Sequence, residues 1–329
     1  MRRRVTLGTM KRSSLCGVLG ADGFIGSHLV HALVARDFRV RAIDKFPNGR
    51  SLNLEQIRNR IEMVSADLFC EEDLDTQFLE GVEYLFHFAT PSTPASSLLD
   101  PIREFRNHLL PTLRLFDMAS QNGVRRVIFA SSGGTVYGPA PKCPATENSV
   151  LQPVFPHSIV KVALEYYLAF LRLRGLDSIV YRIANPYGPR QRGWMTKQGV
   201  ISVFLRAALL DEPVQVSNDK NAIRDYIFVG DLTEAILKSF WRPHKHHVYN
   251  IGSGIGTDLQ TIIRLIEKTT RKRLKKTTEK APVAQTSRIV LNIGRIQREF
   301  HWQPQLSLLQ GIRRTWEWIR DQEFATNYL

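Results

Sequence analysis

Cysteine is scarce in this chain, which has three cysteines in 329 residues. Cys16, Cys70 and Cys143 are odd in number and form no CxxC pair, which argues against a disulfide framework and against a structural zinc site. Unpaired cysteines are typical of a reducing compartment, so we expect a cytoplasmic location and no bound metal.

Long apolar runs are also absent. No stretch approaches the roughly 20 apolar residues that span a bilayer, and the first residues, MRRRVTLGTMKRSS, lack the apolar core of a signal peptide. We therefore expect no membrane partner, and we interpret the first ten residues as a short extension before the folded domain.

Acidic residues are outnumbered by basic ones. The chain has 45 Lys and Arg against 31 Asp and Glu, which gives a formal charge of +14 and favours anionic ligands. The basic residues are scattered, and the small cluster at 271–276 (RKRLKK) has no aromatic residues interleaved with it. This distribution is typical of a solvated surface, and we expect no nucleic-acid partner.

The residues that are present alternate between strand-like and helix-like patterns. Short apolar runs predict buried strands in SLCGVLG, RVRAID, IEMVSADL, YLFHFAT, RRVIFASS and LDSIVYRIAN. Helical patterns lie between them at 24–36, about 71–80, about 101–122 and from His157 to about Arg174. This alternation predicts an α/β fold, here a Rossmann-like doubly wound parallel sheet.

The pattern changes after residue 186, where PYGPRQRG is rich in turn residues. Further helical patterns follow at 199–210, 258–269 and 307–322, with another strand in HVYNIGS. We expect a Rossmann-like cofactor-binding domain and a smaller C-terminal lobe that binds the substrate. The expected bounds are 11–185 and 224–251 for the domain, and 186–223 and 252–329 for the lobe.

The string GVLGADGFIGSHL contains a GxxGxxG motif formed by Gly20, Gly23 and Gly26. It follows a predicted strand and opens a predicted helix, where glycines allow a tight turn and let backbone N–H groups approach a pyrophosphate. The anion would bind at the helix N-terminus. A simple tight turn could produce the same pattern, so the motif needs a second signal.

That second signal is Asp44, which ends the next predicted strand about 20 residues later. A carboxylate there accepts hydrogen bonds from the adenosine ribose and repels a 2′-phosphate, so the sequence predicts NAD rather than NADP. Arg41 and Lys45 flank the acid and weaken this preference. Asp67, at the end of the third strand, could hold the adenine amino group or could cap the helix that follows.

Several motifs occur in an order and spacing that resemble one family. GADGFIGSHL, ASSGGTVYG, RIANPYGPRQ, IRDYIFVGDL, VYNIGSG and TWEWI resemble, from about residue 13 to 320, the extended short-chain dehydrogenase/reductases, in particular nucleotide-sugar epimerases of the UDP-glucose 4-epimerase type. The resemblance implies that bound NAD takes a hydride from carbon 4 of a UDP-hexose and returns it to the other face. In this family a tyrosine takes the hydroxyl proton, and a lysine four residues later holds the nicotinamide ribose.

The resemblance assigns roles to individual residues. Lys161 matches the lysine, and Thr135 in SSGGTVYG matches the hydroxyl that binds the reacting oxygen, with Ser132 in reserve. Some members carry a serine where this chain has Gly133. Thr135 and Ser132 could instead cap a strand end. Further positions expected along the cofactor are Phe24, Ile25, Leu68, Phe88, Ala89 and Thr90.

Two more positions match residues that bind the sugar nucleotide in the family. Asn185 in RIANPYG matches an asparagine on the sugar diphosphate, and Arg224 in IRDY matches an arginine on the pyrophosphate. Alternatively, Asn185 forms a turn before a proline and Arg224 pairs with Asp225 at the surface. The family also carries an Arg and an Asp that contact the nucleotide in a stretch that here reads APVAQTS, where both charges are missing.

The largest departure from the family is the absence of YxxxK. None of the nine tyrosines has a lysine four residues later, and His157 stands at that position before Lys161. An imidazole with an ordinary pKa of about 6.5 can exchange a proton at neutral pH. Lys161 and a nicotinamide cation would both disfavour its protonated form.

Three interpretations therefore remain open. In the first, the chain is an active nucleotide-sugar epimerase or 4-keto reductase in which His157 is a replacement base or proton relay. In the second, it is a weak or inactive relative that still binds NAD and has a binding or regulatory role. In the third, it catalyses a different reaction. The helices at about 101–122 and 157–174 match those of a four-helix dimer interface in the family, so we also expect a homodimer.

Overall fold

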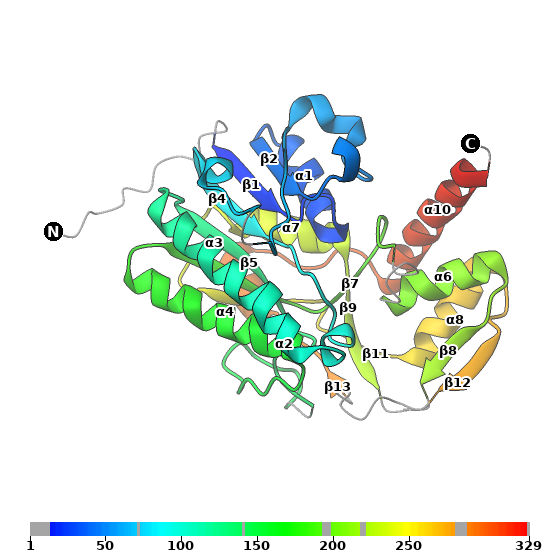
Figure 1. Ribbon diagram of the computed structural model, residues 1–329. Coiled ribbons are helices and arrows are strands. Elements are labelled where there is room, and N and C mark those ends of the chain that lie inside the picture. The colour runs from blue at the N-terminus through cyan, green and yellow to red at the C-terminus, as the bar shows by residue number, and fades with distance from the viewer. Residues whose placement is uncertain are drawn as a thin grey trace.

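The main structural element is a parallel sheet of seven strands (Figure 1). The computed structural model describes residues 14–70, 73–139, 142–192, 199–217, 222–279 and 288–327. The strands run in the order β10-β6-β5-β4-β1-β2-β3. Their bounds are β1 Leu15–Leu19, β2 Arg39–Asp44, β3 Glu62–Ser65, β4 Val82–His87, β5 Arg126–Ser132, β6 Asp177–Ile183 and β10 Val248–Ile251. This sheet confirms the predicted Rossmann-like α/β class.

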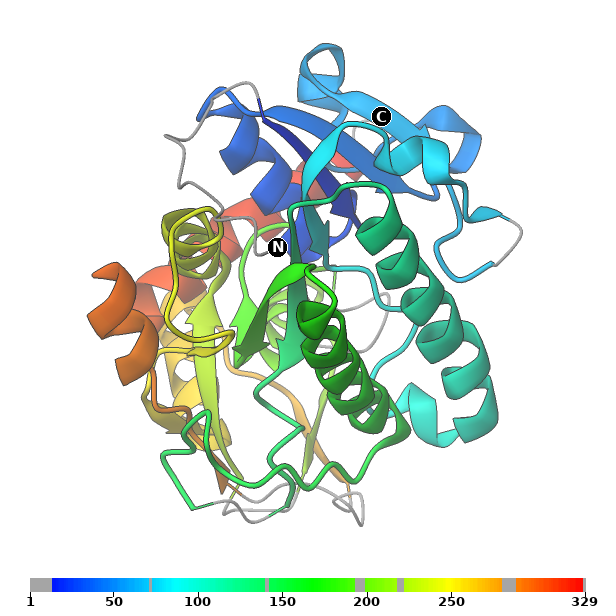
Figure 2. The same cartoon turned by 90° about the vertical axis from the view of Figure 1, so that its left-hand side faces the viewer.

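Helices cover both faces of the sheet, which explains why β1 is apolar and buried along its whole length. On one face, α1 (Phe24–Val34), α7 (Val229–Ser239) and α9 (Gly294–Phe300) share one apolar core with the strands. On the other face, α3 (Leu110–Gln121) and α4 (Pro156–Leu173) share a second core. Both views show α3 and α4 side by side (Figure 2).

A smaller lobe is built from parts of the chain after β6, whereas β10 belongs to the main sheet and α7 and α9 pack on it (Figure 1). Its two sheets contain β7 Asn185–Tyr187, β9 Ile223–Phe228, β11 Gly256–Asp258 and β13 Arg288–Ile289, and β8 Val214–Ser217 with β12 Lys276–Glu279. Its helices are α6 Val200–Leu210, α8 Leu259–Thr270 and α10 Leu308–Asn327. They bury a third apolar core around Phe204, Ile262 and Ile312. Of the two strands between 223 and 251, β9 lies in the smaller sheet and β10 in the main one; the domain bounds stay a prediction.

The helix expected at 101–122 contains an irregular turn. α2 (Pro101–Glu104) continues into a π-helical turn, η6 (Phe105–Leu109), and then into α3. The helix begins at Pro101 because the Asp100 side chain accepts a hydrogen bond from the N–H of Arg103. A π turn holds one more residue than an α turn and is found frequently at functional sites.

The helix expected at 71–80 is only a 3₁₀ turn in its described part, η4 (Thr76–Leu79), which Asp75 caps and which ends before Gly81 with φ +73°. Further 3₁₀ turns in the described part of the chain include η1 Pro47–Gly49, η2 Glu55–Arg60 and η5 Ser96–Leu98. Within the described ranges, no helix combines the length and the apolar character needed to cross a bilayer.

Candidate active site

A cavity of about 1200 Å³ lies at the carboxyl ends of the parallel strands. β1 lies between β2 and β4, so the chain crosses to opposite sides of the sheet at this point and leaves a crevice there. The segments that follow β1 to β6 line the cavity. Doubly wound sheets bind their ligands in such a crevice.

The glycine motif forms the first part of the cavity wall. Gly20 has φ +76°, and a Cβ at this position would lie 2.8 Å from backbone atoms of Ala89. A Cβ at Gly26 would lie 2.0 Å from the carbonyl oxygen of Gly20. Side chains are therefore excluded from both positions, and the first turn of α1, which contains no acidic residue, is open to an anion.

Asp44 ends β2 and lines the same cavity. Its carboxylate accepts hydrogen bonds from the N–H groups of Asp22 at 2.9 Å and Lys45 at 2.8 Å. The two flanking cations are already paired, Arg41 with Glu62 at 2.8 Å and Lys45 with Asp67 at 2.8 Å. Neither is therefore an unpaired partner for a 2′-phosphate, which supports the choice of NAD over NADP.

Asp67 forms a turn rather than a helix cap. Its carboxylate accepts the N–H of Phe69 at 3.1 Å, and no helix starts there among the described residues. Seven further residues predicted along the cofactor lie on the cavity wall, namely Gly23, Phe24, Ile25, Leu68, Phe88, Ala89 and Thr90, whereas Lys161 does not.

Two hydroxyl groups face the cavity where β5 ends. The Thr135 hydroxyl donates to Ser132 Oγ at 2.9 Å, and both residues line the cavity. Gly133 between them is tightly enclosed, because a Cβ there would lie 2.6 Å from Leu291 Cδ1. A serine at position 133 would not fit without a shift, which leaves Thr135 and Ser132 as the available hydroxyls.

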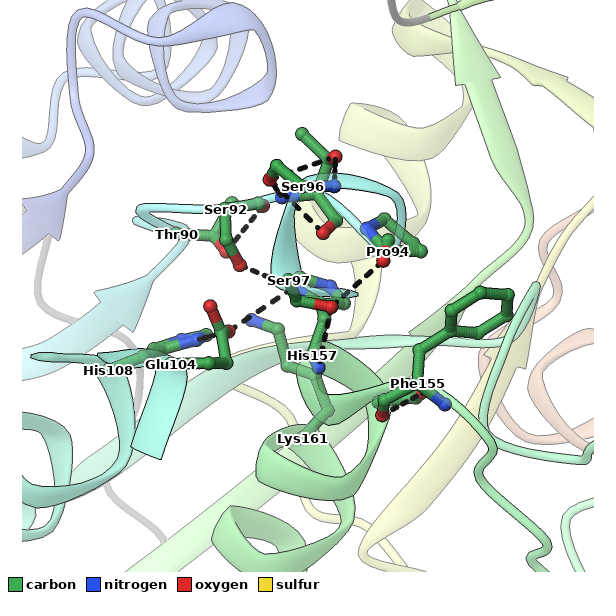
Figure 3. Close-up of polar contacts among 12 residues, drawn as sticks. Thr90, Ser92, Pro94, Ser96, Ser97, Glu104, His108, Phe155, His157 and Lys161 are labelled. Atoms are coloured by element: carbon green, nitrogen blue, oxygen red, sulfur yellow. Dashed lines mark hydrogen bonds and ion pairs between the residues drawn. The ribbon is translucent and has the colours of Figure 1, made fainter. Parts of the chain in front are cut away.

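His157 lies in the first turn of α4 and lines the cavity. Its Nδ1 is 3.1 Å from Ser92 Oγ, and its backbone N–H donates to Ser97 Oγ at 3.2 Å (Figure 3). Burial lowers the pKa of His157 below 6.5 and the Lys161 charge lowers it further, whereas Glu104 raises it. The imidazole is thus neutral near pH 7 and can accept a proton.

Lys161 lies one turn later on α4 and is buried. Its ammonium group donates to the carbonyl oxygen of Ala130 at 3.0 Å and lies 4.8 Å from the centre of the Phe129 ring. Burial lowers the pKa of Lys161 to about 8, against the opposing charges of Glu104 and Glu165. His157 and Lys161 therefore lie one turn apart on the same helix, as their spacing predicts, but only His157 is part of the cavity wall.

No tyrosine among the described residues lines the cavity. Tyr137, the nearest in sequence to the predicted site, is buried and donates its hydroxyl to Asn250 Oδ1 at 2.6 Å. Tyr166 on α4 is 67% exposed on the outer surface. His157 has no tyrosine substitute within the described residues.

The sequence did not indicate two residues that adjoin His157. Glu104 Oε1 accepts a hydrogen bond from His108 Nδ1 at 2.8 Å and lies 3.7 Å from His157 Nδ1 (Figure 3). Both Glu104 and His108 are buried, in a stretch that the sequence predicts as a helix of a dimer interface. The only available signal was the Glu-x-x-x-His spacing, which places both side chains on one helix face.

The two predicted sugar-nucleotide residues differ in position. Asn185 begins β7, lines the cavity and donates to the carbonyl oxygen of Asp225 at 2.8 Å. Arg224 lies on β9 and is not part of the cavity wall; its guanidinium donates to the carbonyl oxygen of Ile223 at 3.1 Å. Asp225 is buried and accepts hydrogen bonds from Ser253, so it forms no surface pair with Arg224. The segment APVAQTS lies outside the described residues.

Glu104, His108 and His157 each offer a possible metal ligand, and the three ligand atoms lie within 4.8 Å of one another. A cation there would have to compete with the hydrogen bond between Glu104 and His108 and with the charge of Lys161, which interacts with Glu104. The local charges therefore favour a hydrogen-bonded cluster.

The sheet, the glycine turn and Asp44 define a dinucleotide-binding protein of the Rossmann class. The chain belongs to the NAD dependent epimerase/dehydratase family, whose model matches residues 16–252. NAD dependence of the family confirms the predicted cofactor, and the residues on the cavity wall fit it.

Individual relatives confirm the predicted class of enzyme. The UDP-glucose 4-epimerase of Mycolicibacterium smegmatis is 33% identical over 309 residues, which cover 93% of this chain and 98% of the relative. The dTDP-4-dehydro-6-deoxyglucose reductase of Escherichia coli is 30% identical over 308 residues, which cover 92% and 96%. The crystal structure of UDP-glucose 4-epimerase from Thermotoga maritima with UDP-glucose has 30% identity and a TM-score of 0.87, and the match covers 94% of this chain and 99% of that one.

Proposed function

We propose that the protein is an NAD-dependent UDP-hexose 4-epimerase in which His157 moves the proton that a tyrosine moves in related enzymes. One observation carries this proposal. His157 lines the cavity together with Thr135 and Ser132, its Nδ1 is engaged by Ser92, and no described residue forms a hydrogen bond with its Nε2. A neutral imidazole with a free Nε2 is a suitable general base.

Each residue has a defined task in this proposal. When bound, NAD would supply the redox chemistry, which is hydride transfer from carbon 4 of the sugar and back to the opposite face. Gly20, Gly26 and Asp44 would hold the cofactor. Lys161 would reach the nicotinamide ribose from behind the cavity wall, by exchanging its hydrogen bond to Ala130 for one to the ribose.

The proton follows a separate path from the hydride. His157 Nε2 accepts the proton of the 4-hydroxyl, so the O–H bond breaks and an N–H bond forms, which makes the ring an imidazolium. The Thr135 hydroxyl, which donates to Ser132 Oγ in the free protein, turns to donate its hydrogen bond to the reacting oxygen. In the second half of the reaction the imidazolium returns its proton to that oxygen, and the histidine is neutral again.

The test is the interconversion of UDP-glucose and UDP-galactose by the purified protein and by two variants. We expect turnover by the native protein, a loss of roughly 10²–10⁴-fold in His157→Ala, and unchanged NAD binding in that variant. His157→Tyr should not exceed the native rate, because Glu104 lies next to the ring position.

Two results would contradict the proposal. If the native protein is inactive and His157→Tyr gains a large rate, the chain is a silent NAD-binding relative. If His157→Ala keeps the native rate, His157 is not the base.

A nucleotide-sugar 4-keto reductase is the second candidate, favoured by the similarity to dTDP-4-dehydro-6-deoxyglucose reductase. A reductase consumes one NADH for each 4-keto sugar reduced, whereas an epimerase has no net consumption. Incubation with NADH and a nucleotide 4-keto-6-deoxy sugar, followed by absorbance at the reduced nicotinamide band, separates the two reactions.

The assembly we propose is a homodimer that uses the outer faces of α3 and α4. Apolar side chains are exposed there on adjacent turns, with Ile159, Tyr166, Phe170 and Leu173 from α4 and Leu110 from α3. Exposed apolar side chains that gather along one side of a helix mark an interaction site. The free state of all three cysteines supports the predicted cytoplasmic location.

A further inference from the structure

A buried carboxylate adjoins the ring nitrogen of His157 that faces away from the proposed proton transfer. Glu104 Oε1 lies 3.7 Å from His157 Nδ1, and Ser92 Oγ lies 3.1 Å from the same nitrogen (Figure 3). The Glu104 side chain is 4% exposed and that of His157 is 8% exposed. Water therefore screens little of the interaction between the two.

Glu104 is itself held in place by His108. The His108 Nδ1 donates to Glu104 Oε1 at 2.8 Å, and its Nε2 is buried without a hydrogen-bond partner among the described residues. The π-helical turn η6 contains His108 and follows Glu104 directly. Burial lowers the pKa of His108 to about 4, so its ring is neutral and donates from Nδ1 only.

The carboxylate determines which nitrogen of His157 carries the proton. Although burial raises the pKa of Glu104, the hydrogen bond from His108 and the polar groups of His157 and Ser92 nearby lower it to well below its usual range, so the group is ionised. An ionised carboxylate only accepts hydrogen bonds, so a nitrogen that faces it carries hydrogen. The nearby carboxylate thus favours the tautomer in which His157 Nδ1 carries the proton and donates to Ser92 Oγ, with the lone pair on Nε2.

The carboxylate also offsets unfavourable charge. The titratable groups that act on His157 are Lys161 on the same helix and Glu104 and His108 on the neighbouring helix, and His87 at the end of β4 interacts with Lys161 and His108. His87 and His108 are neutral because burial lowers the pKa of each. Lys161 is a cation, and Glu104 is the one anion in this set, so it compensates the charge that appears when His157 becomes an imidazolium.

We propose that Glu104 is a positioning residue for His157, which fixes the Nδ1–H tautomer and stabilises the imidazolium formed during proton transfer, with His108 holding the carboxylate in place. This inference rests on the proposed function of His157. It explains how a histidine can replace a tyrosine next to Lys161. The Lys161 cation stabilises a tyrosinate, which needs no anionic partner, but it destabilises an imidazolium, which needs one.

The test compares Glu104→Gln in the native chain and in the His157→Tyr background. In the native chain we expect kcat/KM to fall about 10–100-fold. In the His157→Tyr background the sign reverses, because the carboxylate disfavours a neighbouring tyrosinate; the rate should stay the same or rise. Glu104→Asp, which keeps the charge, should retain more activity than Glu104→Gln in the native chain.

The pH profile gives a second readout that a merely structural role would not move. Glu104 raises the pKa of both His157 and Lys161. In Glu104→Gln, both limbs of the kcat/KM profile should therefore shift to lower pH. Glu80→Gln removes a carboxylate at an exposed position outside the cavity wall and should leave both limbs in place.

Nuclear magnetic resonance of the histidine ring separates failure of this inference from failure of the proposed function. With ¹⁵N-labelled histidine, native His157 should show the Nδ1–H tautomer, and its pKa should drop in Glu104→Gln. If all variants lack epimerase activity but these signals appear, the function is wrong and the coupling stands. An unchanged His157 pKa in folded Glu104→Gln, or an equal loss of rate in both backgrounds, overturns the inference.

Discussion

At the scale of single residues, the site combines positions that allow one residue only with positions that depend on their neighbours. Gly20 and Gly26 belong to the first kind, because backbone atoms occupy the space of any side chain. His157 belongs to the second kind. Its protonation state depends on Lys161 and Glu104, which act in opposite directions on its pKa.

Asp44 should set the preference for NAD. We expect Asp44→Asn to bind NAD about 10-fold less tightly and to bind NADP with equal or improved affinity, because the charge that repels a 2′-phosphate is gone. Fluorescence titration of both cofactors would measure this. Asp75→Asn, which removes a charge from the exposed cap of η4, is the matched control. Equal loss of affinity for both cofactors would contradict the assignment.

At the scale of helices and strands, α4 carries His157 and Lys161 and is fixed to β6 by a buried ion pair. Glu165 Oε2 and Arg182 Nη2 are 2.6 Å apart, and each side chain is 6% exposed. Glu165 also accepts a hydrogen bond from Ser131 on β5. The pair therefore positions the helix against the strands that end at the cavity.

Glu165→Ala should destabilise the protein strongly, because it leaves the Arg182 guanidinium buried without its partner. We expect a loss of about 3–5 kcal/mol in the free energy of unfolding, measured by urea denaturation. Arg36→Ala breaks the exposed pair with Glu234, whose side chains are 44% and 38% exposed, and should cost less than about 1 kcal/mol. Similar losses in both variants would show that the buried pair does not anchor α4.

The elements and the cofactor residues could be predicted from the sequence because their signals are local. One βαβ unit of roughly 30 residues contains the strand after Ser14, the glycine turn and Asp44. Glu104 and His108 could not be predicted as site residues, because their role depends on contact with His157, more than 40 residues away. Their own segment has an ordinary helical pattern, which does not indicate the π turn inside it.

At the scale of the whole molecule, the proposed dimer can be tested without affecting the site. We expect the protein to sediment as a dimer at micromolar concentration and Phe170→Glu to sediment as a monomer that still binds NAD, because a charge would be buried at the apolar face. Ile255→Glu, on an exposed position in the smaller lobe, is the control and should remain a dimer. A native monomer under these conditions would contradict the proposal.

The π-helical turn has a consequence for how such a site can arise. One additional residue in a helical turn rotates everything after it by about 100° relative to an uninterrupted α-helix. Because of this rotation, the direction of the buried face of α3, which contains Leu115 and Phe116, does not fix the direction in which Glu104 and His108 point. A family member could gain or lose an anionic partner for its catalytic helix through the insertion or deletion of one residue, while its sheet and its core remain as they were.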